Sequence, residues 1–416
     1  MFNCYTALPN GELAVRSRFG ILLGALAGAY LLPLTQSAKA GEPKPQVLTN
    51  FYANGYPKGN LLLGKAGALF GTTSGVYGGD PSQRGGVYEL VPPIAGQKLW
   101  SKIVLHVFKS RNEGFNPLVG LVADPSGNLY GTAYPGVVFQ LSPPPSGQTE
   151  WSYSILANPP PAMPAGELYR ASDGTLYATA AGSYQNGCFC GSVYSVSPPT
   201  KGGQWTYSLL YAFLGGSDGE NPESGILADS AGNLYGTTTQ GGPANAGTVF
   251  ELSPPANGQT TWTEKQLYAF QGGADGELPM GNLAWGSNGA IYGTTDHTVF
   301  ALTPPSNGQG AWVETVLAAT SLSDDLETGV LVGASGTLYG TVVGNGRRGG
   351  GSVYALHPPS NGGTTWNLHV LYNFKDHGFG PSTPQGGLIE GMSGLLYGTT
   401  TGGGIHGDGT VFSIQK

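Results

Sequence analysis

Short stretches of alternating apolar and small polar residues recur along this chain, in place of the longer 3.6-residue periodicity that predicts helices. The most regular stretch reads Leu-Tyr-Gly-Thr, or a close variant, and it occurs seven times with its aromatic residues 47 to 60 residues apart. Alternation rich in aromatic and β-branched residues predicts a β-strand. The seven aromatic residues are Phe70, Tyr130, Tyr177, Tyr235, Tyr292, Tyr339 and Tyr397.

The residues around each copy predict four strands per repeat. A Gly-Leu-rich strand comes first, as at 225–228, and a glycine lies three residues before every aromatic, where a hairpin turn needs a positive φ. A third strand of the type seen at 247–252 follows. A Pro-Pro pair ends this strand in six repeats, because proline has no N–H for a ladder bond. The fourth strand then follows a tryptophan, as at 205–213.

The number of fourth strands predicts how the chain closes. Six repeats have one, and the last repeat, 387–414, does not. The segment 47–52, which precedes the first repeat, matches a fourth strand without its tryptophan. If it completes the last blade, a ring closes and the exposed edges of an open array disappear. We therefore predict an all-β fold over 41–416: a seven-bladed β-propeller with four antiparallel strands per blade, closed by the N-terminal strand.

Composition and charge narrow the class of protein. The chain has 71 glycines and 31 prolines, but these recur at fixed offsets, and 39% of residues are hydrophobic, which favours turns in a folded protein over disorder. Only 10% of residues are charged and the net charge is −7. These values argue against nucleic acid as a partner and against an anionic membrane surface.

The N-terminal segment predicts export. Arg16 and Arg18 precede an apolar run at 21–32, and Ala38-Lys39-Ala40 follows, which is the order of a secretory signal peptide. The run is too short to span a bilayer, and a buried first strand is the alternative interpretation. We expect a signal peptide over 1–40, cleavage after Ala40, and a monomer that is secreted or periplasmic with no remaining membrane span. Cys188 and Cys190 would remain, and whether this closely spaced pair is bonded stays open.

The repeat unit resembles the GloVer tandem repeat of bacterial "choice-of-anchor" proteins. The resemblance rests on the order Leu-Tyr-Gly-Thr-Thr, Gly-Gly, Gly-Thr-Val-Phe-Glu-Leu and Pro-Pro, and it covers roughly 47–414. It implies an extracellular protein that is usually tethered by a C-terminal anchor, and it implies no activity. The sequence ends at Lys416 without a hydrophobic tail, so we expect free secretion or a periplasmic location.

Strand order places the fourth-to-first loops and the second-to-third loops on one face, which we call the loop face. Propeller ligands generally bind on the face with the longer loops, around the central channel. Two consecutive fourth-to-first loops, 215–220 and 272–277, repeat a Gly-Gly-x-Asp-Gly-Glu pattern, and acidic residues recur at 324–327. Such carboxylates are candidate Ca²⁺ ligands, and the alternative is a repeated, solvated Asp-Gly turn. The candidates are Asp218, Glu220, Asp275 and Glu277.

The last repeat holds a second group of candidates on the loop face. His377 follows Asp376 in one loop, and His406 and Asp408 lie in the next. Histidine and carboxylate together are suited to general acid–base chemistry or metal binding, and solvated loop residues are the alternative. Two functions follow. The first is an exported, non-catalytic module that binds an extracellular ligand, a glycan or an envelope protein, with calcium as its only candidate cofactor. The second is a secreted lyase or hydrolase that uses His377, His406 and Asp408, with or without a metal.

Overall fold

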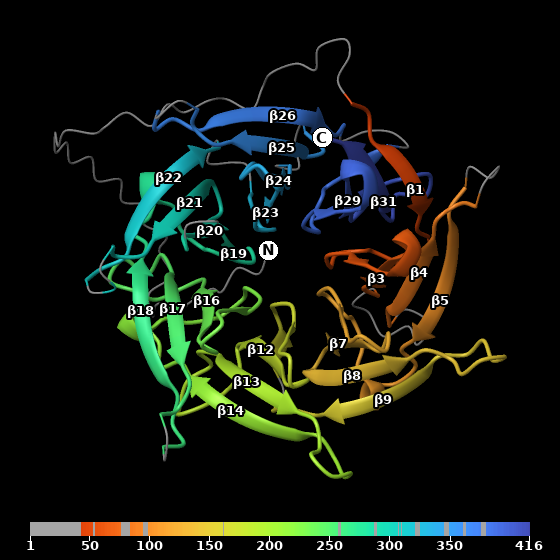
Figure 1. The fold of residues 1–416 in the computed structure, drawn as a ribbon, viewed down its shortest axis with the longest axis horizontal. Coiled ribbons are helices and arrows are strands. Elements are labelled where there is room, and N and C mark those ends of the chain that lie inside the picture. The colour runs from red at the N-terminus through yellow and green to blue at the C-terminus, as the bar shows by residue number, and fades with distance from the viewer. Residues whose placement is uncertain are drawn as a thin grey trace, which may run out of the picture. The chain divides into compact units, whose positions relative to one another are not determined.

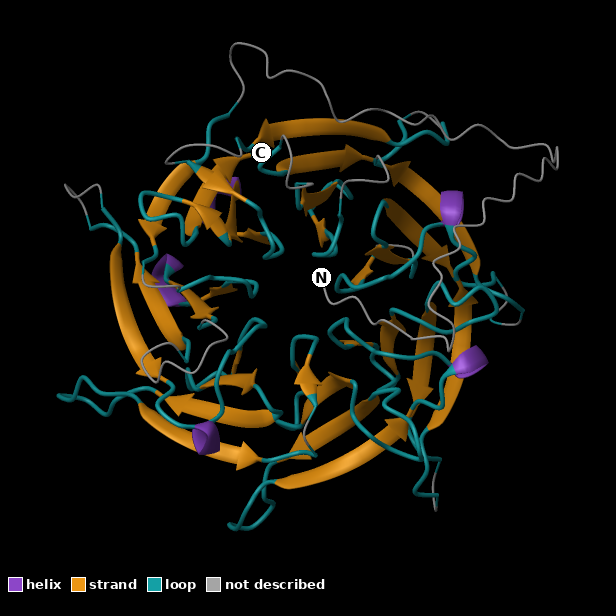
Figure 2. Ribbon diagram, turned by 180° about the vertical axis from the view of Figure 1, so that it is seen from behind, coloured by secondary structure: helices purple, strands orange, loops and turns teal. Residues whose placement is uncertain are grey.

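The computed structural model describes residues 43–52, 55–75, 84–94, 99–160, 162–256, 259–286, 289–306, 308, 310–320, 325–344, 349–360, 363–375 and 380–416. The predicted signal peptide, 1–40, lies outside the described residues. The described chain forms seven antiparallel sheets, or blades, arranged in a ring around a central axis (Figure 1). Figure 2 shows the ring from the other side, with the short helical turns lying in loops outside the sheets.

In the first six blades the chain runs from the axis outward, and in the seventh the outermost position is taken by the N-terminal strand. The first strands are β2 (Leu62–Leu63), β6 (Val122–Ala123), β11 (Tyr169–Arg170), β15 (Leu227–Ala228), β19 (Ala284–Trp285), β23 (Leu331–Val332) and β28 (Ile389–Glu390). The second strands are β3 (Leu69–Thr73), β7 (Leu129–Ala133), β12 (Leu176–Ala181), β16 (Leu234–Thr238), β20 (Ile291–Thr294), β24 (Leu338–Val342) and β29 (Leu395–Thr400).

The third and fourth strands complete the blades on the outside of the ring. The third strands are β4 (Gly86–Val91), β8 (Val137–Ser142), β13 (Ser192–Ser197), β17 (Thr248–Ser253), β21 (Thr298–Thr303), β25 (Ser352–His357) and β31 (Thr410–Gln415). The fourth strands are β5 (Ser101–Val107), β9 (Ser152–Ala157), β14 (Thr206–Ala212), β18 (Thr263–Ala269), β22 (Val313–Ala319), β26 (Asn367–Asn373) and β1 (Gln46–Asn50).

Short elements lie in the connections. β10 (Met163–Pro164) pairs with β12 and makes the third sheet five-stranded, and β27 (Pro381–Ser382) pairs with β30 (Gly402–Gly403). The 3₁₀ turns are η1 (Lys65–Gly67), η2 (Arg111–Glu113), η3 (Gly216–Asp218), η4 (Gly273–Asp275) and η5 (Met392–Gly394).

The N-terminal strand closes the ring, as the sequence predicts. β1 pairs antiparallel with β31, from Gln46 opposite Ser413 to Asn50 opposite Thr410. The register of this pair shifts around Leu48. Every other fourth strand has a bulge at a leucine in the same place, so β1 is a complete member of the repeat and needs only its tryptophan to match the others. The other bulged leucines are Leu105, Leu156, Leu210, Leu267, Leu317 and Leu371.

Two contacts explain the glycine and the threonine of the Leu-Tyr-Gly-Thr strand. A Cβ on Gly236 would lie 2.6 Å from Cζ of Phe250, so the glycine makes room for the aromatic ring of the third strand. The next residue, Thr237, donates from Oγ1 to the carbonyl oxygen of Pro279 in the following blade, at 2.6 Å. The equivalent Thr399 of the last blade donates to Gly59 of the first, across 340 positions of sequence, and so repeats this link at the closure.

Aromatic contacts connect adjacent blades at their outer ends. Trp205 of the third blade packs against Tyr130 of the second, with ring centroids 5.9 Å apart, and Trp100 of the first blade packs against Tyr397 of the last at 6.1 Å. No tryptophan precedes β1. There the ammonium group of Lys416 lies 5.2 Å from the ring centroid of Tyr339, so a cation replaces the indole at this one junction.

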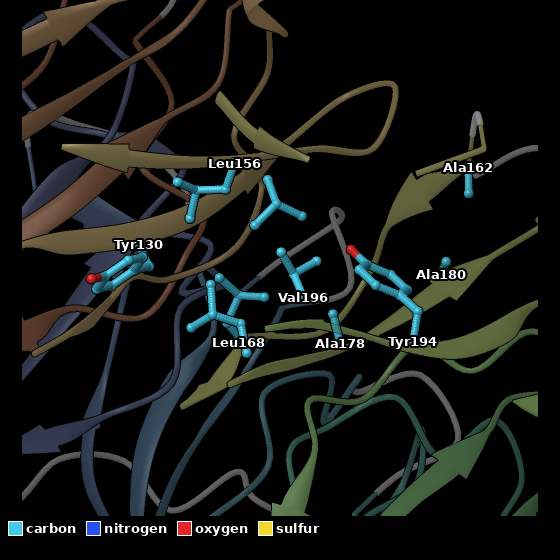
Figure 3. Close-up of a cluster of buried hydrophobic side chains, with 10 residues drawn as sticks. Tyr130, Leu156, Ala162, Leu168, Ala178, Ala180, Tyr194 and Val196 are labelled. Atoms are coloured by element: carbon cyan, nitrogen blue, oxygen red, sulfur yellow. The ribbon is translucent and has the colours of Figure 1, made fainter. Parts of the chain in front are cut away.

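The hydrophobic core is divided among the junctions between blades. One cluster joins Tyr130 and Leu156 of the second blade to Leu168, Tyr194 and Val196 of the third, and all five are buried (Figure 3). The closing junction has its own cluster, which includes Leu48 of β1. Each blade is therefore held by both neighbours, and the loops at the axis are carried on a closed, packed frame.

Candidate functional site

Every blade enters its first strand through the same five-residue segment. A proline comes first in six blades and Leu326 takes its place in the other, and the fifth residue is a buried aliphatic side chain. Between them lie three residues, of which at least one in every blade lines a pocket at the axis. The seven segments are 57–61, 117–121, 164–168, 222–226, 279–283, 326–330 and 384–388.

These segments line one pocket on the axis, which we call the channel mouth. Its volume is about 140 Å³, and all seven blades contribute to it. The residue directly after the proline, or after Leu326, lines it in every blade: Lys58, Leu118, Ala165, Glu223, Met280, Glu327 and Gln385. The sequence pattern predicted Glu327 as one of the acidic loop residues and did not predict the other six. The signal that would have found them is the proline in six of the seven segments, five residues before the first strand.

A polar network forms the floor of the channel mouth. The third residue after the proline is polar in blades 1, 3 and 5, as Asn60, Glu167 and Asn282, and it is glycine in the other four blades. Asn282 Nδ2 donates to Glu167 Oε2 at 3.1 Å, and Asn282 Oδ1 accepts from the backbone N–H of Gly225 at 2.7 Å. Asn60 Oδ1 accepts from the N–H of Gly387. Seven side chains would not fit at the axis, so the glycines leave room for three.

The floor carboxyl group has an unusual environment. Burial raises the pKa of Glu167, and the nearby amide groups of Asn60, Gly120 and Asn282 oppose that rise. Glu167 Oε1 lies beside Asn60 and the Gly120 backbone, but it is buried and no donor of the described residues meets it in hydrogen-bonding geometry. Burial therefore makes this carboxyl group easier to protonate than an exposed glutamate.

The rim of the channel mouth carries charges of both signs. Burial raises the pKa of Glu223, the positive charge of Lys58 lowers it, and the negative charge of Glu327 raises it. Gln385 Nε2 donates to Glu327 Oε2 at 3.4 Å. The acceptor-rich side of the rim thus comes from blades 4, 6 and 7, and the cation comes from blade 1.

The candidate calcium ligands lie away from the axis, where two of them stabilise their own loops. Asp218 accepts from the hydroxyl of Tyr211 at 2.6 Å and from the N–H of Leu214 at 2.7 Å. Asp275 repeats both contacts one blade later, with Tyr268 and Gln271. Glu220 is half-buried and Glu277 is exposed. Among the described residues, no three His, Cys, Asp or Glu side chains form a group that could hold a metal ion.

The candidate catalytic residues of the last blade are only partly described. His377 and Asp376 lie outside the described residues, so their distance from His406 is not defined. His406 is exposed and packs edge-on against Tyr52, with ring centroids 6.0 Å apart. Asp408 is half-buried and its backbone bridges to Gly403.

A buried histidine, His297, joins two loops in a way that the sequence did not predict. His297 is 4% exposed, its Nε2 lies 2.7 Å from the carbonyl oxygen of Gly273, and its Nδ1 lies 2.5 Å from Asp296. These contacts join the second-to-third loop of blade 5 to the loop that precedes that blade. The sequence offered no sign of this burial, because a histidine beside an aspartate in a short loop is usually solvated.

The loop 182–191 of the third blade, on the loop face, contains both cysteines of the repeat region. Cys188 and Cys190 form a disulfide, which answers the question left open by the sequence. Phe189 lies between the two cysteines and is 67% exposed, and Tyr184 lies before them and is 57% exposed. Their ring centroids are 4.7 Å apart. This loop presents an aromatic pair to solvent near the outer part of the loop face.

The closed ring and its axial pocket define a seven-bladed β-propeller. Its fold resembles two extracellular domains from B. thetaiotaomicron, one of a hybrid two-component system (TM-score 0.51, 12% identity, 90% of this chain and 41% of the other) and one of a one-component system (TM-score 0.57, 9% identity, 89% and 40%). PorZ, a surface component of the type-IX secretion system of P. gingivalis, is also similar (TM-score 0.53, 13% identity, 84% and 45%). The chain spans about two fifths of the length of the first two proteins.

A family model matches the repeat that is seen in the sequence. Residues 134–311 match the model of the Gloeobacter/Verrucomicrobia repeat, as the motif predicted. No curated protein matches the sequence. Among the described residues, no helix is long and apolar enough to cross a membrane.

Proposed function

We propose that this protein is an exported binding module that holds a small ligand, or the end of a larger one, in the channel mouth. The observation that carries this proposal is the convergence of one residue from each of the seven blades on a single polar pocket of about 140 Å³. Ligand sites are concave and have a few converging polar groups, and propellers bind ligands at the axis. Pockets for drug-sized ligands are larger, roughly 300 to 1,000 Å³, so the volume favours a small molecule or a chain end.

The frame of the site supports binding by a preorganised pocket. The rim residues lie in the segments that lead into the first strands, and the floor residues are held by amide hydrogen bonds that cross from blade to blade. A rigid pocket loses little conformational entropy when a ligand binds. The same features favour a binding role over catalysis by the loop residues His377, His406 and Asp408, of which His406 is an exposed side chain packed on Tyr52.

Export is part of the proposal. The signal peptide over 1–40, with cleavage after Ala40, would deliver the propeller to the periplasm or the medium, where a glycan or an envelope component is a natural source of the ligand. Similarity to extracellular domains supports this location. N-terminal sequencing of the protein secreted by a bacterial host tests it: the expected N-terminus is Gly41, and retention of Met1 in the cytoplasm would contradict it.

A thermal-shift screen tests the binding site. A panel of amino acids, monosaccharides, dicarboxylates and polyamines is added to the wild-type protein and to Ala165→Trp, which fills the channel mouth. The control is Ala274→Trp, which adds the same side chain to an exposed loop on the same face. We expect a ligand that raises the melting temperature of the wild type and the control but not of Ala165→Trp. A ligand that stabilises all three equally would place binding elsewhere and refute the proposal.

A further inference from the structure

The rim charges of the channel mouth are held apart. Lys58 lies in the segment that follows β1, and Glu223 and Glu327 precede β15 and β23, on the fourth and sixth blades. Each is half-buried. Among the described residues, no ion pair joins Lys58 to either carboxylate within 4.0 Å, although its charge is close enough to lower the pKa of Glu223. A cation and two anions therefore face one another across a gap that they do not close.

The two carboxylates also oppose each other. The charge of Glu327 raises the pKa of Glu223, which means that the rim resists holding both as anions. A positive group between them would relieve this repulsion and satisfy both. Gln385 already donates one hydrogen bond to Glu327 Oε2. A carboxylate has two oxygens and can accept further hydrogen bonds from a ligand.

Apolar side chains separate the charged positions. Leu118 and Ala165 lie on the blades between Lys58 and Glu223, and Met280 lies between Glu223 and Glu327. Such side chains suit a short methylene segment better than a ring of hydroxyl groups. A volume of about 140 Å³ corresponds to about five water molecules at roughly 30 Å³ each. The space is thus limited to a ligand of a few heavy atoms.

From this arrangement we propose that the ligand is a small zwitterion whose ammonium group binds between Glu223 and Glu327 and whose carboxylate binds Lys58. The proposal rests on the proposed function, because it names the ligand class of the same pocket. The ammonium group supplies three donors, which matches the acceptors of the two glutamates, and Lys58 supplies the matching donor for a carboxylate. An ω-amino acid has both groups on an unbranched chain, and its length can be varied to match the gap.

Proton release provides a second readout. An ammonium group beside Glu223 favours its charged form, so the ligand should lower the pKa of Glu223. The ligand should therefore bind more tightly as the pH rises through the pKa that Glu223 has in the ligand-free protein. The titratable groups that face Glu223 are Lys58, Glu327 and the floor carboxyl of Glu167. The ammonium group of the ligand also weakens the repulsion between Glu223 and Glu327. We therefore expect the protons released on binding to come from these two carboxyl groups and not from Lys58.

Calorimetric titration with a length series tests the proposal. The probes are glycine, β-alanine, 4-aminobutanoate, 5-aminopentanoate and 6-aminohexanoate, each compared with the amine and the carboxylate of the same chain length. We expect the amino acid of one chain length to bind at least tenfold more tightly than the average of the next shorter and next longer ones. It should also bind at least tenfold more tightly than the amine or the carboxylate of its own length. Titration in two buffers of different ionisation enthalpy should show proton release.

Matched variants assign the two charges. Lys58→Met should bind the zwitterion no better than the wild type binds the amine alone, and Glu223→Gln should bind it no better than the carboxylate alone. The controls Lys65→Met and Glu150→Gln remove exposed charges elsewhere and should leave the affinity unchanged. Equal affinity for the zwitterion and the amine would show that Lys58 takes no part and would overturn the ligand class.

The two proposals fail in different ways. If no amino acid binds but another compound is excluded by Ala165→Trp, the zwitterion is wrong and the channel mouth remains the binding site. If a zwitterion binds equally well to wild type, Lys58→Met, Glu223→Gln and Ala165→Trp, both proposals are wrong.

Discussion

Two half-buried carboxyl groups at neighbouring blade junctions make the stability of this propeller depend on pH. Glu264 of β18 lies beside Asp218 of the preceding blade, and Glu314 of β22 lies beside Asp275 in the same way. Burial, with the aspartate charge as the second cause, raises the pKa of each glutamate to about 7. In each, Oε1 is buried and has no hydrogen-bond partner among the described residues.

The size of the effect follows from the pKa change. A rise from 4.5 to about 7, at about 1.4 kcal/mol per unit, would correspond to about 3 kcal/mol per group if the side chain were fully buried. Both glutamates are only half-buried, so solvent screening reduces the expected value to about 1 kcal/mol each. Because the folded state holds the proton more tightly than the unfolded state, this stabilisation is complete below about pH 4.5 and is lost as pH rises through about 7.

Urea unfolding of the double variant Glu264→Gln/Glu314→Gln tests this reasoning. At pH 8 the variant should have a free energy of unfolding about 2 kcal/mol higher than that of the wild type, and at pH 4.5 the two should be nearly equal. Glu150→Gln removes an exposed carboxylate and should follow the wild-type curve at every pH. If the double variant and the wild type lose stability in parallel between pH 4.5 and 8, the two junction carboxyls are not the cause.

Two substitutions and one deletion test which interactions stabilise the ring of blades. Leu278 has φ +51, where the equivalent residue of the preceding blade is Asn221, so Leu278→Asn should raise the free energy of unfolding by about 0.5–1 kcal/mol in urea titrations. Gly247 has φ +97, and a Cβ there would lie 2.5 Å from Pro279 Cδ, so Gly247→Ala should lower the melting temperature and cost more than about 1 kcal/mol. Removing 43–50, which includes β1, should expose the edge of β31 and cause concentration-dependent association in light scattering.

The repeat made the fold readable from sequence. Strand type, turn position and the number of fourth strands all recur seven times, so a single interpretation had to satisfy every copy, and the pairing of β1 with β31 confirmed it. The bulge at Leu48 and its equivalents was not predicted, because an extra residue in a short alternating strand has no separate signature. The motif also did not reveal that Thr237 links its blade to the next, since that contact crosses between repeats.

The channel mouth was harder to predict for the same reason that the fold was easy. A repeat pattern shows what the seven units share, whereas the rim of the pocket is a position at which they differ, occupied by Lys58, Glu223 and Glu327 among others. Charged residues that lie more than a hundred positions apart meet only when the ring closes. The repeated loop pattern instead predicted Asp218 and Asp275 as metal ligands, and in the structure these two carboxylates accept hydrogen bonds from Tyr211 and Tyr268.

The most direct test of the binding site is a crystal structure of the propeller with the most tightly bound ω-amino acid. The account predicts electron density for the ligand at the axis on the loop face, with its nitrogen within hydrogen-bonding distance of Glu223 and Glu327 and its carboxylate next to Lys58. Density for the ligand at the exposed rings of Tyr184 and Phe189, or anywhere else away from the axis, would contradict it.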